Sequence, residues 1–210
     1  MLLLVNRQVL GRSSKRRGNS LEREIAQQLS DWTGEYFKRS PTSGADHGLK
    51  NFGISADVIT TWKEWPYIVE CKFYNAGSWT LENVLHGNSW FPKFVSQSVR
   101  EGHTEGAPFM LIFRRDYVKP FVLMPYSSKL ANKLSHYMVS DIEYASEVTG
   151  GIEVIKTITF TMEELVTLDK NWFISSYDKN WENKIKKKKK NSKKVASVDN
   201  ILSSIKDLGV

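Results

Sequence analysis

The sequence has only one cysteine, Cys71, among its 210 residues. A single thiol cannot form an internal disulfide framework, so a small secreted domain stapled by disulfides is excluded, and we expect a reducing, cytoplasmic setting. Long apolar runs are also missing. The segment Met1–Val5 is far shorter than the roughly 18 apolar residues that a membrane span requires. We therefore expect no signal peptide, no membrane span and no membrane partner.

The sequence has no net positive charge outside one short segment. The net charge is +7, but eight lysines between residues 184 and 194 account for more than all of it, and the rest of the chain carries −1. A protein whose whole surface coats nucleic acid is therefore excluded. The distribution predicts a nearly neutral body, a basic tail that binds phosphates, and a smaller basic patch formed by Lys15, Arg16 and Arg17.

What the chain does have is enough apolar material for a core, with 40% hydrophobic and 12% aromatic residues. We expect a basic, flexible lead over residues 1–18 and a core domain over residues 19–126. Residues 127–181 would be an extension packed on the core. Residues 182–210 would form a lysine-rich tail that ends in a short amphipathic helix.

The order of elements predicts an α/β domain. Apolar residues at helical spacing from Leu21 to Trp32 indicate a helix over about 19–32, followed by an ordered loop over 39–48. Alternating and β-branched residues predict strands over 54–61 and 67–73, paired as a hairpin. A second helix should begin near Phe91 and end just before Gly102. Further strands are expected over 109–113, 121–124 and 152–160, and further helices over 128–134 and from Thr161 onward, where Thr161 and Glu164 suggest a capping box.

The segment Glu70-Cys71-Lys72 carries an acid and a base on one face of a predicted strand. Side chains alternate along a strand, so Glu70 and Lys72 point to one side and Cys71 points to the other. An edge strand whose outer face is solvated by an ion pair would show the same pattern. The segment alone therefore leaves both interpretations open.

Asp57 favours the chemical interpretation. If the turn is centred on residues 63 and 64, hairpin pairing places Asp57 directly opposite Glu70, with Cβ atoms about 4.5–5.5 Å apart. Two carboxylates this close repel each other unless a cation or a proton lies between them. Oxygen ligands of this kind suit Mg²⁺. The pairing therefore predicts a metal site with Lys72 beside it.

Two helical residues are weaker candidates for the same site. Glu22 borders the apolar stripe of the first helix and could supply a third carboxylate, although Asn19 and Glu22 could equally form a capping box that opens this helix. Gln97 lies near the apolar edge of the second helix. It could approach the metal or be an ordinary surface glutamine.

Three carboxylates and a lysine match the needs of phosphodiester hydrolysis. A divalent metal ion polarises a phosphoryl oxygen and lowers the pKa of an attacking water. A nearby cation, here Lys72, orients that water and offsets developing negative charge. The cofactor that we expect is Mg²⁺, for which Mn²⁺ can substitute, with no small-molecule cofactor.

Four segments occur in an order that resembles the archaeal Holliday-junction resolvases of the PD-(D/E)-x-K nuclease superfamily. They are Lys15-Arg-Arg-Gly-Asn-Ser-Leu-Glu22-Arg23-Glu24, Arg39-Ser-Pro-Thr-Ser43-Gly44, Ala56-Asp57-Val-Ile and Ile68-Val-Glu70-Cys-Lys72. The resemblance extends from about residue 15 to residue 126. One departure is Ala56, which stands where the superfamily name has proline, but the adjacent aspartate that can bind metal is kept.

The resemblance implies a restriction-endonuclease-like core, with a central mixed β-sheet flanked by helices. By the same resemblance, Asp57, Glu70, the Cys71 carbonyl and Glu22 would hold the metal, and Lys72 would be catalytic. DNA contacts would fall to Arg23, Arg39 and the Ser40–Ser43 loop. The resemblance further implies a homodimer that resolves branched DNA in recombination and repair, in the host cytoplasm if a phage encodes the chain.

Two other functions remain open at this point. The same site could serve a restriction-like or nicking nuclease on ordinary duplex DNA. Alternatively, the chain could be an accessory DNA-binding protein that keeps the fold without the chemistry. The complete set of three acids and a lysine argues against the accessory role.

Overall fold

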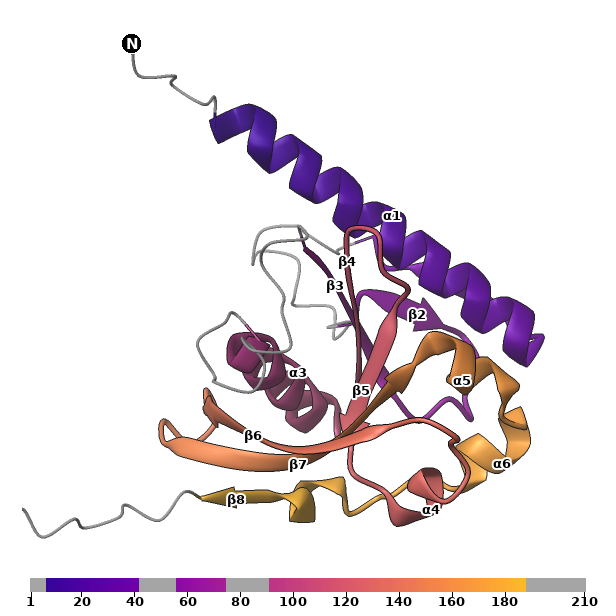
Figure 1. The fold of residues 1–210 in the computed structure, drawn as a ribbon, viewed down its shortest axis with the longest axis vertical. Coiled ribbons are helices and arrows are strands. Elements are labelled where there is room, and N and C mark those ends of the chain that lie inside the picture. The colour runs from indigo at the N-terminus through magenta and orange to yellow at the C-terminus, as the bar shows by residue number, and fades with distance from the viewer. Residues whose placement is uncertain (1–6, 42–55, 75–90, 188–210) are drawn as a thin grey trace, which may run out of the picture.

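The computed structural model describes residues 7–41, 56–74 and 91–187. They form an eight-stranded mixed sheet with helices on both faces (Figure 1). The strands are β1 (Phe37–Arg39), β2 (Val58–Thr60), β3 (Ile68–Tyr74), β4 (Phe109–Arg115), β5 (Phe121–Pro125), β6 (Met138–Ala145), β7 (Ile152–Thr161) and β8 (Ile185–Lys187). The helices are α1 (Arg7–Thr33), α3 (Phe91–Glu105), α4 (Ser128–Ala131), α5 (Met162–Thr167) and α6 (Lys170–Ser175), and η2 (Trp181–Lys184) is a 3₁₀ turn.

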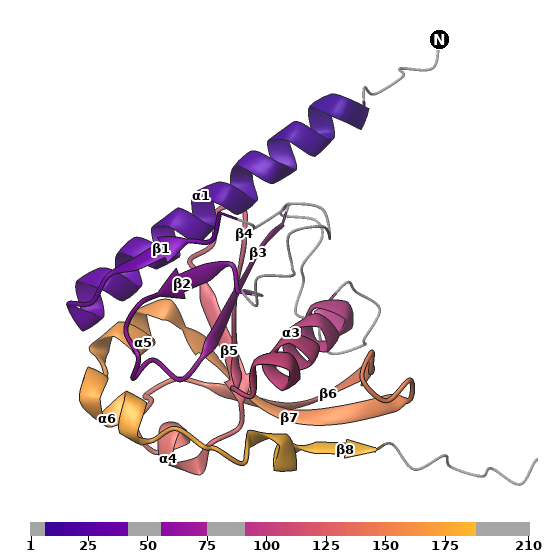
Figure 2. The same ribbon diagram turned by 180° about the vertical axis from the view of Figure 1, so that it is seen from behind.

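The strand order is β1-β2-β3-β4-β5-β7-β6, and β8 pairs with β7. Strands β3 and β4 are parallel, because α3 forms the crossover between them, and the other pairs are antiparallel. Long helix α1 lies across one face of the sheet and α3 lies on the other, as the two opposite views show (Figures 1 and 2).

The period of two along the central strands divides the apolar residues between two cores. On β4, Met110 and Ile112 pack with the buried residues of α1, whereas Leu111 and Phe113 pack with those of α3. Strand β3 follows the same alternation, and its residue Cys71 belongs to the α1 core. The face of β3 that carries Glu70 and Lys72 is therefore the face that α3 covers.

Both long helices extend further than the sequence predicted. Helix α1 begins at Arg7, so residues 7–18 are helical and are not a flexible lead. Helix α3 continues through Gly102 to Glu105, so Gly102 is not its end. A Cβ at Gly102 would lie 2.8 Å from the carbonyl oxygen of Ala107 and 3.0 Å from the Trp181 ring. This glycine is needed because the chain approaches the helix closely there.

The predicted hairpins and most strands are present, but the sequence missed β1, β6 and β8. Residues 127–181 continue the sheet, because β7 pairs with β5 over five residues and β6 pairs with β7. The predicted capping box is half formed. The Thr161 side chain accepts a hydrogen bond from the Glu164 backbone N–H, while the Glu164 carboxylate binds Ser135 and His136 instead.

The lysine-rich tail begins inside the fold. Lys186 and Lys187 belong to β8, which pairs with β7, so the segment from residue 182 to 187 is ordered. The terminal amphipathic helix predicted over 198–208 lies outside the described residues. No described helix is both long enough and apolar enough to cross a membrane.

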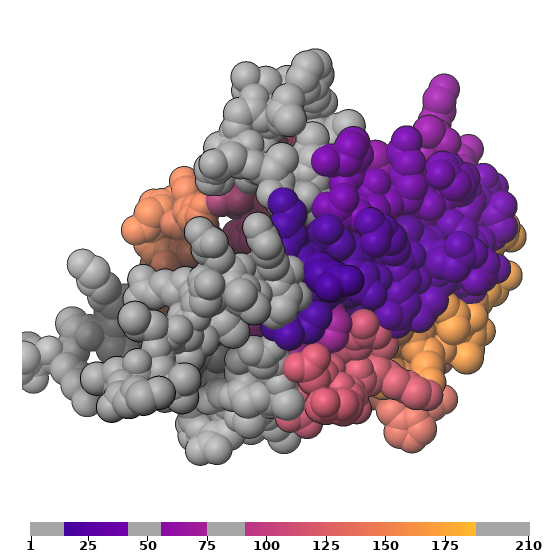
Figure 3. Space-filling view, turned by 90° about the horizontal axis from the view of Figure 1, so that it is seen from above, coloured from indigo at the N-terminus to yellow at the C-terminus, as the bar shows by residue number. Residues whose placement is uncertain are grey.

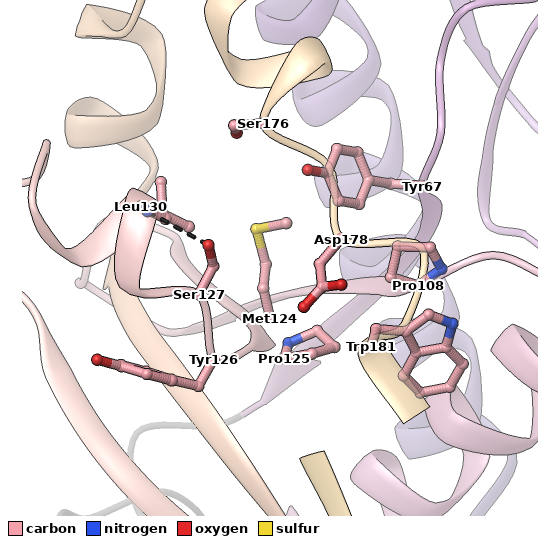
Figure 4. Close-up of a pocket in the computed structure, with 10 residues that line it drawn as sticks. All are labelled: Tyr67, Pro108, Met124, Pro125, Tyr126, Ser127, Leu130, Ser176, Asp178 and Trp181. Atoms are coloured by element: carbon pink, nitrogen blue, oxygen red, sulfur yellow. Dashed lines mark hydrogen bonds between the residues drawn. The ribbon is translucent and has the colours of Figure 1, made fainter. Parts of the chain in front are cut away.

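A small cavity of about 20 Å³ lies where the C-terminal segments meet the core (Figure 4). Its lining includes Tyr67 from the segment before β3, Met124 from β5, and Ser176, Asp178 and Trp181 from the chain after α6. The volume suits one water molecule, so this cavity is a packing seam and not a substrate site. Burial beside Tyr177 and Asp178 raises the pKa of Tyr67 well above its usual value, which keeps the phenol neutral.

Candidate functional site

The candidate site is centred on the α3 face of β3. Glu70 is 1% exposed, and its Oε2 accepts a hydrogen bond from Lys72 Nζ at 3.1 Å. Lys72 Nζ also lies 3.9 Å from Asp57 Oδ2. The alternative of a solvated edge strand is wrong, because β3 lies between β2 and β4 and its acid is buried.

The predicted hairpin register is confirmed. Val58 pairs with Val69, which places Asp57 opposite Glu70 as expected. The Asp57 backbone N–H donates to the Val69 carbonyl at 2.9 Å, and the Cys71 backbone N–H donates to Asp57 Oδ2 at 2.9 Å. These two bonds fix the Asp57 carboxylate beside the main chain of β3.

Helix α3 adds an amide and a further acid to this group. Gln97 Nε2 donates to Glu70 Oε2 at 3.2 Å and to Glu101 Oε1 at 3.0 Å, so Gln97 is not an ordinary surface glutamine. Glu101 is 4% exposed and was missed by the sequence analysis. Its signal was its position two turns after the apolar residue Phe94, inside the buried stripe of the helix.

The electrostatics follow from burial and from the nearby charges. Burial raises the pKa of Glu70 well above its usual value, the negative charges of Asp57 and Glu101 raise it further, and Lys72 lowers it in part. Burial lowers the pKa of Lys72, but Glu70 and Asp57 outweigh this effect, so the pKa of Lys72 is raised and the side chain stays charged. Burial also raises the pKa of the Cys71 thiol, which keeps it neutral.

Asp57 and Glu70 are the residues best placed to hold a metal ion. Their carboxylate oxygens are the ligands that hard divalent cations prefer, and the raised pKa of Glu70 reflects its burial and the neighbouring charge of Asp57. No group of three or more acidic, histidine or cysteine side chains in the described parts of the chain is placed to hold a metal together. The fit therefore rests on the Asp57 and Glu70 pair.

Glu22 lies on the other side of β3. Helix α1 covers the Cys71 face, and the Glu22 carboxylate, which is buried, accepts a hydrogen bond from Arg39 Nε at 2.5 Å. Since α1 begins fifteen residues earlier, at Arg7, Glu22 does not close the start of a helix, and the capping-box interpretation is wrong. The structure pairs Glu22 with Arg39.

The residues expected to contact DNA differ in their exposure to solvent. Lys15, Arg16 and Arg23 are exposed on α1, with Arg17 half-buried between them. Ser40 is fully buried, and its backbone N–H donates to the Asp57 carbonyl at 2.8 Å, so it positions the Asp57 segment. Ser43 lies outside the described residues.

The surface of α1 continues onto the turn between β4 and β5, as Figure 3 shows from above. Arg114 donates to both carboxylate oxygens of Glu24 at 2.7 Å and lies over the Phe73 ring, 4.6 Å from its centroid. This ion pair ties Glu24 of α1 to Arg114 of β4.

A comparison with family models gives one match. The family described as "Phage putative PDDEXK endonuclease" matches residues 13–175, a span that contains every site residue named above. No curated protein and no solved structure matches. The mixed sheet flanked by helices is the predicted restriction-endonuclease-like fold, and nucleases of this kind act on DNA and generally use divalent metals. The matched span covers most of the chain, which therefore belongs to the phage PDDEXK endonuclease family.

Proposed function

We propose that the protein is a Mg²⁺-dependent endonuclease that cuts branched DNA, such as four-way junctions, as a homodimer. The observation that supports this most directly is the close group that the buried Glu70 and half-buried Lys72 of β3 form with half-buried Asp57, which directly precedes β2. An acid pair with a charged lysine is costly to bury without a ligand, so its presence favours a catalytic use.

Each residue has a distinct part in this proposal. Asp57, Glu70 and the Cys71 carbonyl hold the divalent ion, which is Mg²⁺ or, in its place, Mn²⁺. When bound, the ion polarises the scissile phosphate and lowers the pKa of the attacking water. Lys72 remains protonated because of its two acidic neighbours, so it orients that water and offsets negative charge on the phosphate. Gln97 fixes the rotamer of Glu70.

Glu22 joins the metal site only if its carboxylate leaves Arg39. In the described arrangement, Glu22 holds the guanidinium of Arg39 at the end of β1, where this positive charge can contact a DNA phosphate. Lys15, Arg16, Arg17 and Arg23 extend this basic surface along α1. A junction with two-fold symmetry needs two such surfaces and two sites, which is why we propose a homodimer that acts in the cytoplasm of the cell containing the DNA.

Cleavage of two DNA substrates tests the proposal. The full chain would be incubated with a labelled four-way junction and with a linear duplex of identical sequence, in Mg²⁺, in Mn²⁺ and in EDTA. We expect paired nicks in the junction with either metal, little cutting of the duplex, and no product in EDTA. Light scattering of the free protein should give the mass of two chains.

Lys72→Met is the matched variant, because methionine keeps the length of the side chain and removes its charge. It should bind the junction with nearly unchanged affinity and fail to cut it. Equal cutting of duplex and junction by the native chain would point to a nicking nuclease instead. Binding without cleavage in either metal would indicate an accessory protein.

A further inference from the structure

We propose that Glu70 and Glu101 form a second divalent-cation position on the α3 face of β3, next to the one formed by Asp57 and Glu70. The inference rests on the proposed function, because both positions share Glu70. It adds a residue from α3 that neither the sequence motifs nor the family match assigns. Each position would be lined by two acidic side chains, with water completing the ligands, as is usual for Mg²⁺.

The first observation is an unsatisfied oxygen on Glu101. Its Oε1 accepts hydrogen bonds from Gln97 Nε2 at 3.0 Å and from Arg100 at 3.2 Å. Its Oε2 is buried and has no hydrogen-bond partner among the residues that the structure describes. A buried carboxylate oxygen without a donor is costly, so the site is incomplete without a cation or a water.

The second observation is what this acid faces. One amide bridges the two carboxyl groups, because Gln97 Nε2 lies 3.2 Å from Glu70 Oε2 and 3.0 Å from Glu101 Oε1. Ionised carboxylates offer only acceptors to each other, so they repel unless a proton or a cation lies between them. Gln97 donates to both acids and holds them side by side.

The local charges favour a cation over a proton. Asp57, Glu70 and Glu101 are three acids, and the cations beside them are Lys72 and Arg100. Arg100 is shared, because it also pairs with Glu147 at the surface. With all three acids ionised, the cluster keeps a net negative charge that a divalent ion would offset.

A second position would also suit the chemistry. Phosphodiester cleavage develops charge on the attacking oxygen and on the leaving oxygen, and two ions can stabilise both. The position at Asp57 and Glu70 has Lys72 beside it. The position at Glu70 and Glu101 lies toward α3, where the neighbouring cation Arg100 is shared with Glu147 at the surface, so charge on the second oxygen needs its own ion.

Counting bound Mn²⁺ tests this inference without relying on activity. The full chain would be titrated with Mn²⁺, and free Mn²⁺ would be measured by electron paramagnetic resonance. We expect two ions for each native chain and one for Glu101→Gln. Glu105→Gln, which removes an exposed acid one turn later on the same helix, should keep two.

The outcomes separate the inference from the function on which it rests. One ion on the native chain with metal-dependent cleavage, or two ions on Glu101→Gln, would overturn the second position and leave the proposed nuclease intact. No bound ion and no cleavage would count against both. If circular dichroism shows that Glu101→Gln is unfolded, Glu101→Asp replaces it. That variant should bind the second ion more weakly by about tenfold or more, and unchanged affinity would refute the inference.

Discussion

The two faces of strand β3 differ in what their helices supply. The α1 face is apolar around Cys71, and its buried acid, Glu22, is held by Arg39. The α3 face carries Glu70 and Lys72, and α3 adds Gln97 and Glu101. Both faces therefore hold a buried acid next to the strand. Among the residues that the structure describes, the acids of the α3 face outnumber the cations paired with them, whereas Glu22 and Glu24 on the α1 side are each paired with an arginine. An excess of acids is the condition for binding a metal ion.

The largest effect on cleavage should come from Asp57, the acid that directly precedes β2 and lies beside Lys72. Asp57→Asn keeps an oxygen that can accept from the Cys71 N–H, so the fold should be preserved. It removes the charge that would hold the ion, and we expect cleavage to fall by about a thousandfold or more, since metal ions contribute several kcal/mol. Single-turnover cleavage of the junction measures this.

The control for that variant is Asp141→Asn, which changes an exposed aspartate on β6, far from the site in sequence. It should leave cleavage unchanged. If Asp57→Asn cut at the native rate, the chemistry would not lie on this strand, and the comparison between its faces would lose its basis.

An intermediate effect is expected on α3. Gln97→Leu removes two hydrogen bonds to carboxylates, and bonds to charged groups are worth about 1.5–3 kcal/mol, so cleavage should fall by roughly ten- to a hundredfold. The matched variant Gln27→Leu, on the exposed side of α1, should cut normally. If both variants cut like the native chain, α3 would be only a packing element.

The register of the site could be predicted from sequence, because side chains alternate along strands and a short connection leaves few pairings. Residues around Asp57 and Glu70 provided enough β-branched and apolar positions to fix both strands. The same reasoning placed Glu70 and Lys72 on one face and Cys71 on the other, as the structure has them.

The features that the sequence did not predict have physical explanations. Strand β6 is mostly exposed and carries Ser140, Asp141 and Glu143, so its strand signal is weak, and it is held by pairing with β7. The first part of helix α1 contains Gly11 and Gly18, which disfavour a helix, so its sequence signal before Leu21 is weak. Glu101 was missed because Glu70 of β3 is brought near it only by the crossover of α3 over the sheet. Such long-range contacts leave no local pattern.

A smaller effect on cleavage is expected on the α1 face. Glu22→Gln breaks a largely buried ion pair with Arg39, so we expect a loss of about 1–3 kcal/mol in the free energy of unfolding, measured by urea titration. Cleavage at low temperature should fall by less than about tenfold, because Arg39 can still approach a phosphate. A loss as large as that of Asp57→Asn would show that Glu22 leaves Arg39 and binds the metal.

The smallest effect concerns stability without metal, and it depends on pH. The pKa of Glu70 in the folded chain lies above its usual value of 4.5 because of burial, so the folded state binds this proton more tightly than the unfolded state. The stabilising effect of that proton is complete below pH 4.5 and is lost as pH rises through the raised pKa. Glu70→Gln cannot ionise, so in EDTA it should melt higher than the native chain at pH 8 and nearly equal to it at pH 4.5.

Comparing the native chain with Glu70→Gln also separates the loss of stability caused by burying an ionised Glu70 from the proposed role of Glu70 in binding metal. A gain of about 1 kcal/mol corresponds to roughly 2–4 °C in a domain of this size, which a thermal melt resolves. Saturating Mn²⁺ should reverse the order, because a ligand stabilises only the protein that binds it, and Glu70 is shared by both proposed positions. If the variant melted lower than the native chain in EDTA at pH 8, Lys72 would already compensate the charge of Glu70. The α3 face would then be no more dependent on a metal ion than the α1 face, where Arg39 satisfies Glu22.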